Sequence, residues 1–368
     1  MPLTELKVRG PYTGPRGYER HTREFVREIH NQGIAVELFD CPEWGAGGLP
    51  TAMRDPWFDS LNGPTSARTA LHFCMPNQVV PFDGLINVNY TMFEATRIHP
   101  LWVAHNMTHD LVILPTESSK RAWVASGVPE DLIRLCPLGI NARLFSKPAM
   151  PLPLRLDNGE PIEEFKVRFL NVSQVDERKN LVGLLRVWLI ATSRQDDAIL
   201  MLKLGYQPHL FDQFRRRVLE MQAQAGKGLE EAAPIHVITN LYPDSEMPRL
   251  YAAATHYISM SHGEGWDLPM MEAAASGLRL IAPNHSAYPA YLDPSVADLI
   301  PSREIPAVFA GVSRSWFENT SWWEPDEDEA VRYLRSAICG TDSGKGSPRR
   351  RILSEFTWEP RLSGLSPS

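Results

Sequence analysis

The sequence predicts an α/β protein made of two doubly wound domains, each built around a parallel sheet. Two observations predict this fold class. Short apolar runs of strand type alternate with helical patterns, and the alternation stops at a proline-rich stretch and then starts again. The chain of 368 residues is also too long for one ordinary α/β domain and suits two.

The first half of the chain contains the first series of strands and helices. Apolar runs predict strands at residues 6–8, 34–39, 71–75, 85–90 and 110–116. Helical patterns follow at residues 19–31 and 99–109, and a further helix closes at Gly127. We therefore assign residues 1–146 to an N-terminal domain.

The proline-rich segment 147–164 is predicted to be a linker, because proline disfavours both helix interiors and central strands. Beyond it, strands are predicted at residues 165–173, 198–205, 235–239, 255–260 and 278–283. Helices are predicted at residues 181–192, 210–226, 245–254 and 269–277. Residues 165–340 then form a C-terminal domain, and residues 341–368 form a loop and a short tail helix. Ligands of such sheets bind beyond the carboxyl ends of the strands, so a cleft between the two domains is the expected active site.

Composition excludes several classes of function. The net charge of −7 and pI near 5.9 disfavour general nucleic-acid binding, which needs a basic surface. The four cysteines are scattered without a CxxC pair, which disfavours a zinc knuckle or a disulfide framework. With no long apolar run, we expect a soluble, cytoplasmic protein. Residues 16–30 carry several basic side chains, which leaves peripheral membrane contact open, although a solvated helix face is the simpler interpretation.

The segment SHGEGWDLPMMEAAASG, residues 261–277, carries the strongest functional signal. A predicted strand enters a turn with Gly263 and Gly265, and a helix then begins near Pro269, which Asp267 is expected to cap. Leu268 lies between them and is a further candidate for donor contacts. The turn therefore brings free N–H groups to the mouth of the cleft, where a phosphate or sugar oxygen can bind. Glu264 can reach a hexose hydroxyl and Glu272 a ribose diol. Chance spacing and simple helix–sheet packing are the alternative explanation.

The segment FLNVSQVDERKNLVGLLRVW, residues 169–188, is the second signal. Arg178 and Lys179 stand between a strand end and a helix, where cations suit a diphosphate. An exposed capping pair is the alternative. Gln174 and Lys203, near the ends of two strands, are further candidates for donor contacts, although a lysine at a strand end is usually just solvated.

Two weaker signals lie in the first half. Gly14 and Gly17 belong to a glycine-bearing loop, GPYTGPRGY, between the first strand and the first helix, and such a loop lets backbone amides approach a phosphate or sugar closely. Glu94 follows a strand in YTMFEATR, where it would face the donor sugar or the acceptor. Capping of the following helix explains Glu94 equally well.

Taken in order, these segments resemble the GT4 retaining glycosyltransferases, which have the GT-B fold of two Rossmann-like domains. The family pattern reads E-G-[FW]-G-L-P-x-x-E-A-x-A-x-G, and this chain has EGWDLPMMEAAASG, with Asp267 where glycine is usual. The turn at Pro137, Gly139 and Ile140 also matches the family's P-x-G-[IV] element. By this resemblance the N-terminal domain takes the acceptor and the C-terminal domain takes the nucleotide-sugar donor.

The resemblance also implies residue roles. Lys179 matches the diphosphate lysine, Glu264 the glutamate that meets the hexose, and Gln174 stands where many members have a phosphate-binding arginine. Arg178 or Lys203 would then share the phosphate contacts. The loop of Gly14 and Gly17 would border the diphosphate from the other domain.

We therefore expect transfer of a sugar from a nucleoside diphosphate to a hydroxyl acceptor, with retention of configuration and no cofactor or bound metal. Asp326 and Asp328 form a D-x-D sequence, but they start a late acidic helix and are interpreted as capping. The acceptor would be a glycan, a lipid-linked sugar or a small molecule. The rival interpretations are a catalytically silent nucleotide-binding or partner protein, and another GT-B enzyme such as a sugar-nucleotide epimerase or a phosphorylase.

Overall fold

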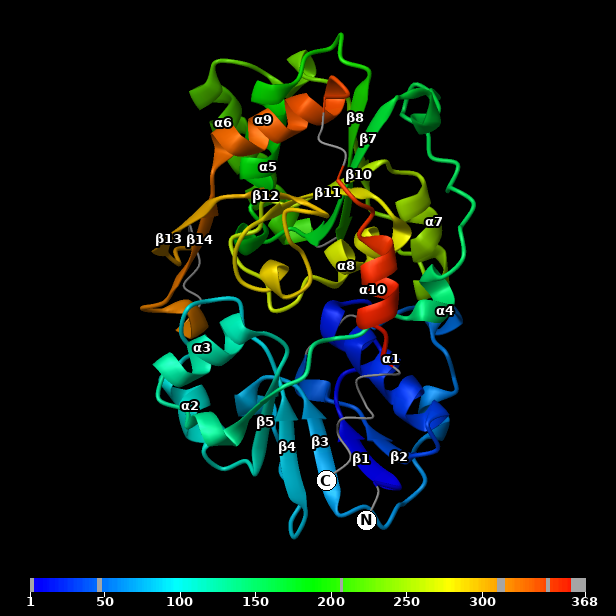
Figure 1. Ribbon diagram of the computed structural model, residues 1–368, viewed down its shortest axis with the longest axis vertical. Coiled ribbons are helices and arrows are strands. Elements are labelled where there is room, and N and C mark those ends of the chain that lie inside the picture. The colour runs from blue at the N-terminus through cyan, green and yellow to red at the C-terminus, as the bar shows by residue number, and fades with distance from the viewer. Residues whose placement is uncertain (1–2, 45–47, 206–207, 310–314, 342–344, 359–368) are drawn as a thin grey trace. The chain divides into compact units, whose positions relative to one another are not determined.

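The computed structural model describes residues 3–44, 48–205, 208–309, 315–341 and 345–358 (Figure 1). The chain divides into two compact units. The first contains Met1–Asn141, Arg314–Ser321 and Ser354–Ser368, and the second contains Ala142–Ser313 and Trp322–Leu353. Residues 342–344 and 359–368 of the predicted tail lie outside the described residues.

The first unit holds a parallel six-stranded sheet in the order β2-β1-β3-β4-β5-β6. Its strands are β1 (Glu5–Arg9), β2 (Ala35–Phe39), β3 (Thr69–Phe73), β4 (Ile86–Tyr90), β5 (Leu111–Leu114) and β6 (Ile133–Leu135). Its helices include α1 (Gly17–Asn31), α2 (Pro100–Asn106) and α3 (Glu117–Ala125). Strand β6 is short and two of its three residues are exposed, so it lacks the apolar run that marks the other strands.

The second unit holds another parallel six-stranded sheet, in the order β12-β11-β10-β7-β8-β9. Its strands are β7 (Val167–Gln174), β8 (Ala198–Gly205), β9 (Ile235–Ile238), β10 (His256–Ile258), β11 (Arg279–Pro283) and β12 (Asp298–Ile300). Its helices include α4 (Ala142–Phe145), α5 (Leu181–Ala191), α6 (Pro208–Ala225), α7 (Met247–Ala252), α8 (Leu268–Ser276) and α9 (Glu327–Ile338). The chain also forms a pair of strands, β13 (Ser302–Pro306) and β14 (Ser321–Pro325), and the tail helix α10 (Arg349–Glu355).

The sequence explains why β8 is an inner strand of the second sheet. Seven of its eight residues, AILMLKL, are buried, as expected for a strand with both faces covered. The apolar face of α5 packs against this strand, and Trp188 is fully buried there. Its indole N–H donates to the carbonyl of Ala233 at 2.9 Å, so the ring is fixed as well as buried. Asp326 accepts from the N–H of Glu329 at 3.0 Å, and so caps α9.

Strand order decides where the second sheet can bind a ligand. Strands β8 and β9 lie on one side of β7. Strands β10, β11 and β12 lie on its other side. The order therefore reverses between β7 and β10, which pair in parallel although they are far apart in sequence. In open α/β sheets, ligands bind beyond the carboxyl ends of the strands at this reversal. In the first sheet the corresponding reversal lies between β1 and β3.

The end of the described chain packs within the first unit. Residues 357 and 140 form a parallel bridge, and the ring of Trp358 stacks on His21 with centroids 5.5 Å apart. A side chain at Gly139 would place its Cβ 2.5 Å from the Trp358 ring. The glycine of the predicted PLGI turn is therefore explained by the close approach of this tryptophan.

Candidate functional site

Two segments of the second unit meet at the reversal of its strand order. The first leaves β7 and runs through the 3-10 turn Glu177–Lys179 into α5. The second leaves β10 and runs through residues 261–267 into α8. The N–H of His262 donates to the carbonyl of Arg178 at 2.7 Å, which joins the two segments directly.

Glu264 is the centre of this site. Its side chain is only 5% exposed, and its two oxygens accept from Lys179 Nζ at 2.7 Å and from Arg178 Nη1 at 3.1 Å. Burial alone would raise the pKa of this carboxyl, but the positive charges of Lys179 and Arg178 outweigh it and lower the pKa to about 2. Glu264 is thus ionised throughout the neutral range, and the three residues form one buried charged cluster.

The turn before α5 holds both cations in place. Asp176 accepts from the N–H of Arg178 at 2.9 Å, and Asn180 adopts a left-handed φ of 48° while its side chain caps α5 through the N–H of Gly183 at 3.1 Å. The alternative of an exposed capping pair is wrong for Arg178 and Lys179, because both side chains are mostly buried against Glu264.

Asp267 occupies the position at which the resembled pattern has glycine. Its φ of 67° lies in the left-handed region, which aspartate tolerates better than most residues. The carboxylate makes no capping hydrogen bond to α8, so the prediction that Asp267 caps this helix is wrong. It accepts from the Tyr288 hydroxyl at 2.8 Å. Burial first, and the charge of Glu264 second, raise the pKa of Asp267 to about 6.

Glu272 lies inside α8 and is 2% exposed. The hydroxyl of Tyr251, on α7, donates to its Oε2 at 2.7 Å, which fixes the orientation of the carboxylate. A buried, oriented carboxylate on the helix that starts at the strand reversal can accept from a diol that enters the site.

The remaining predicted residues of this unit surround the strand ends. Lys203 is 9% exposed near the end of β8, and its ammonium contacts only a backbone carbonyl, of Leu204 at 3.5 Å, among the described residues. Burial lowers its pKa. Lys203 is therefore not the solvated strand-end lysine of the alternative interpretation. Gln174 ends β7, opposite Gly205, and is exposed. Gly263, Gly265 and Leu268 are buried around the turn.

The predicted residues of the first half lie in the first unit. Gly14 belongs to the loop after β1, and its carbonyl accepts from Arg23 at 2.6 Å, while Gly17 is the first residue of α1. Glu94 lies in the irregular segment before α2. The capping interpretation of Glu94 is wrong for this helix, because its N-cap is His99, whose side chain accepts from the N–H of Leu101.

Sequence reasoning missed the tyrosines that enclose Asp267. Tyr288 and Tyr291 lie on and just after a single 3-10 turn that follows β11. Tyr288 contacts both Asp267 and the Ser259 hydroxyl at 2.8 Å, and Tyr291 donates to the carbonyl of Trp266 at 3.1 Å. The repeated aromatic in AYPAYL directly after a predicted strand was the available signal.

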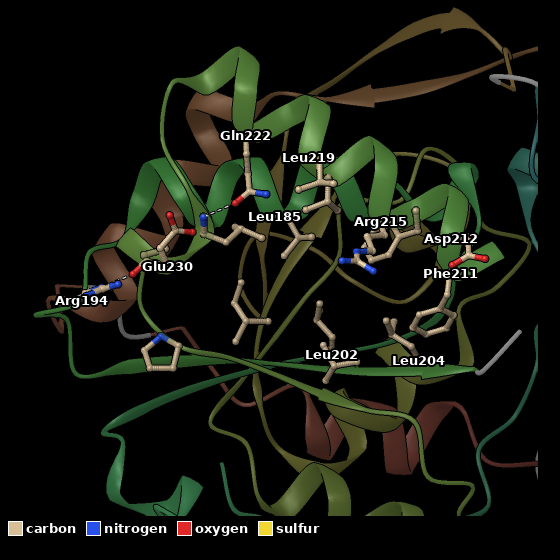
Figure 2. Close-up of a pocket in the computed structure, with 17 residues that line it drawn as sticks. Leu185, Arg194, Leu202, Leu204, Phe211, Asp212, Arg215, Leu219, Gln222 and Glu230 are labelled. Atoms are coloured by element: carbon tan, nitrogen blue, oxygen red, sulfur yellow. Dashed lines mark hydrogen bonds between the residues drawn. The ribbon is translucent and has the colours of Figure 1, made fainter. Parts of the chain in front are cut away.

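A separate cavity of about 1000 Å³ lies between α6 and the strands β8 and β9 (Figure 2). Leu202 and Leu204 point into it from β8, and Phe211 and Leu219 point into it from α6. None of the predicted site residues lines this cavity. It is therefore a feature distinct from the charged cluster around Glu264.

Among the described residues, no helix is both long and apolar enough to cross a membrane. In the same part of the chain, no group of three or more histidine, cysteine, aspartate or glutamate side chains is placed to hold a metal ion.

Solved structures match this fold over nearly the whole chain, whereas no protein-family model and no curated protein sequence matches it. HepE of Anabaena, solved with UDP and glucose, is 13% identical with a TM-score of 0.65, over 98% of both chains. Sucrose-phosphate synthase of Thermosynechococcus elongatus is 15% identical with a TM-score of 0.64, over 98% of this chain and 97% of that one. The lipopolysaccharide outer core galactosyltransferase WaaB is 12% identical with a TM-score of 0.59, over 98% of both chains.

These similarities establish the fold class. The chain has the GT-B fold of two Rossmann-like units, as the sequence predicted. The order of strands in the second unit, 3-2-1-4-5-6 when its strands are counted from β7, is the order of dinucleotide-binding sheets.

Proposed function

We propose that this protein is a glycosyltransferase that moves a sugar from a nucleoside diphosphate to a hydroxyl acceptor. One observation carries the proposal: the buried cluster of Glu264, Lys179 and Arg178 stands where the strand order of the second sheet reverses. This location is the expected ligand site of such a sheet, and it combines cations for phosphate with a carboxylate for hydroxyl groups.

In this proposal the cations serve the diphosphate. Lys179 donates one hydrogen bond to Glu264, and an ammonium has three donors, so it can hold a phosphate oxygen at the same time. Negative charge on the leaving diphosphate grows toward the transition state, where Lys179 and Arg178 would stabilise it. Lys203 supports the same ligand class, because a buried ammonium without a carboxylate partner among the described residues favours an incoming anion.

The two glutamates divide the rest of the donor between them. Glu264 is on the turn and would orient the transferred sugar, whereas Glu272 is within α8 and would accept from the ribose diol. Tyr251 and the Lys179–Arg178 pair pre-orient these carboxylates, so little reorganisation is needed when the donor binds.

We further propose retention of configuration, as in the resembled GT4 enzymes. The bond between the anomeric carbon and the phosphate oxygen breaks, the acceptor oxygen bonds to the same face of that carbon, and the leaving phosphate takes the acceptor's proton. Lys179 and Arg178 supply the positive charge that a bound metal supplies elsewhere, so we propose that the reaction needs none. Glu94 of the first unit is the proposed residue on the acceptor side.

Two further observations support a soluble UDP-sugar enzyme. HepE, which shares the fold, was solved with UDP and with UDP-glucose, so uridine nucleotides are the first donors to test. The four cysteines are all free, which fits the reducing cytoplasm, where we place the protein.

The test is a thermal-shift screen with nucleoside diphosphates and their sugars, followed by an assay of donor hydrolysis. A ligand that binds only the folded state raises the melting temperature. We expect one nucleotide to do so, and its sugar derivative to be hydrolysed slowly without acceptor. Lys179→Ala should abolish most of the turnover, while Lys166→Ala, an exposed lysine of the same unit, should not change it.

Other outcomes of the screen and the hydrolysis assay distinguish the rival functions. If no nucleotide raises the melting temperature, the proposed function is wrong. Nucleotide binding without hydrolysis or transfer would instead indicate a catalytically silent binding protein. Formation of an epimeric sugar, either free or still linked to the nucleotide, would indicate a sugar-nucleotide epimerase.

A further inference from the structure

Asp267 adds a second buried carboxylate to the charged cluster. It is 7% exposed, and Glu264 stands only three residues earlier on the same turn. Glycine would satisfy the left-handed backbone at this position without any side chain. The charge of Asp267 therefore needs an explanation beyond the shape of the turn.

A bound diphosphate would upset the balance of positive and negative charges around Asp267. The titratable and charged groups that face this turn come from every neighbouring element: Arg178 and Lys179 before α5, Tyr257 on β10, His262 and Glu264 on the turn itself, Glu272 on α8, His285 after β11, and Tyr288 and Tyr291. Burial raises the pKa of the three tyrosines well above their usual value, and burial lowers the pKa of His285 to about 3. These four groups are thus neutral near pH 7.

Glu272 and His262 have partners of their own. Glu272 accepts from Tyr251 at 2.7 Å, and the His262 ring lies 3.5 Å from Glu324. Of the charged groups, Glu264 and Lys179 act most strongly on Asp267, and Glu264 also pairs with Arg178. The cluster at Asp267 therefore contains two carboxylates, Glu264 and Asp267, against two cations. A diphosphate that shares Lys179 and Arg178 adds at least two negative charges to this balanced set.

Asp267 is the group whose protonation can offset this added negative charge. Glu264 touches both cations directly and stays ionised, whereas among the described residues Asp267 accepts from the Tyr288 hydroxyl and makes no ion pair. The Tyr288 hydroxyl lies 2.8 Å from Asp267 and 2.8 Å from the Ser259 hydroxyl. Because both hydroxyls can rotate, Tyr288 can donate to the carboxylate or accept from the carboxylic acid. Either protonation state of Asp267 therefore keeps a hydrogen bond.

We propose that Asp267 takes up a proton when the phosphates of a nucleoside-diphosphate ligand bind beside it, so that donor binding and proton uptake are coupled. This inference rests on the proposed function, since it concerns the same ligand class. The proton comes from the solvent, no covalent bond to the ligand forms, and the proton leaves again when the diphosphate dissociates.

The direction of the pH effect follows from the burial of Asp267. Its pKa of about 6 in the free protein leaves it about nine-tenths ionised at pH 7, and the phosphate charge raises that pKa further. A group whose pKa is higher in the complex favours binding at low pH. Affinity should therefore fall by up to about tenfold per pH unit above about pH 6, until the pKa of the complex is reached.

Calorimetric titration with UDP-glucose tests the proposal, because its esterified diphosphate does not titrate near neutral pH. Titrations at one pH in buffers with different ionisation enthalpies give the number of protons taken up. We expect about 0.5 to about 1 proton at pH 7 for the natural protein and close to none for Asp267→Asn. Asparagine tolerates the left-handed backbone and can accept from Tyr288, so this variant should fold, which its melting temperature checks.

Two further variants test whether Asp267 itself takes up the proton. Tyr288→Phe removes a donor to the ionised form, so the proton uptake should move to higher pH. His262→Gln is the matched control for a neighbouring group, and it should leave the uptake unchanged. Uptake that persists in Asp267→Asn, or that disappears in His262→Gln, would overturn the proposal.

Binding and proton uptake are measured separately, so the role of Asp267 and the proposed function can fail independently. Binding of UDP-glucose without proton uptake refutes the role of Asp267 and leaves the transferase proposal intact. If UDP-glucose does not bind at any pH, and no other nucleotide sugar does, the function itself is wrong.

Discussion

The loop after β1 and the turn after β10 each follow a strand at the reversal of strand order in its sheet, but they are stabilised differently. In the first, Arg23 donates to the carbonyls of Tyr12 and Gly14 at 2.8 and 2.6 Å, so backbone contacts shape the loop. In the second, side-chain charges meet, with Glu264 between Lys179 and Arg178. The reversal of strand order thus carries a shaped loop in one unit and a charged site in the other.

This difference indicates what each unit contributes to the proposed transfer reaction. A loop fixed through its own carbonyls can border a ligand, and the positive charges of Arg16 and Arg23 at this loop act on the buried carboxyl of Glu19. A buried cluster with cations at the sheet reversal can neutralise a charged leaving group. Substitutions in the charged turn should therefore change chemistry strongly, whereas substitutions in the loop should change it weakly.

Lys179→Ala should have the largest effect. Loss of an ammonium that stabilises the leaving diphosphate should lower turnover by roughly 10²- to 10³-fold, and weaken binding of the bare nucleoside diphosphate much less. Single-turnover assays beside nucleotide titrations measure the two effects, with Lys166→Ala as the control. Full turnover with weakened nucleotide binding would place Lys179 away from the leaving group.

Glu264→Gln should come next. It keeps the shape of the side chain but removes the charge that orients the sugar, so transfer should fall by roughly 10²-fold while binding of the bare nucleoside diphosphate stays normal. Titration with nucleoside diphosphate followed by a transfer assay at saturating donor separates these effects. If nucleotide affinity is lost and transfer at saturation is kept, Glu264 meets the nucleotide and not the sugar.

Glu272→Ala should reduce donor affinity by roughly 10- to 100-fold, because the ribose diol loses a charged hydrogen-bond acceptor worth about 1.5–3 kcal/mol. The exposed Glu220→Ala on α6 is the matched control. Calorimetric titration of both variants measures the change. An unchanged affinity in a folded Glu272→Ala protein would rule out the ribose contact.

Gly14→Ala should have the smallest effect and tests the other side of the comparison. The new Cβ would lie 2.2 Å from Oε1 and 2.9 Å from Cδ of Glu19, a buried side chain that must shift, so we expect destabilisation of about 1–3 kcal/mol but a change in transfer of less than about fivefold. Thermal melting and transfer assays measure both quantities. A loss as large as that of Lys179→Ala would mean that the loop takes a direct part in catalysis.

Much of the fold could be predicted because its signals are local. The apolar run AILMLKL identifies a buried strand by itself, and the helix that begins near Pro269 is marked by its own first turn. Short strands without such patterns were missed, such as β12 with its three residues. Their pairing partners hold them in the sheet more than their own sequence does.

The sequence by itself determined the residue types of the candidate site, because Glu264, Glu272, Arg178 and Lys179 each stand at a predicted strand end or helix start. Only the tertiary structure decided which of them meet. The contact between Lys179 and Glu264 spans 85 positions and exists because β7 and β10 are neighbours at the reversal of strand order. The tertiary structure also decided that Tyr288 faces Asp267. Burial and long-range contacts set the ionisation of this carboxylate, and neither leaves a local pattern in the sequence.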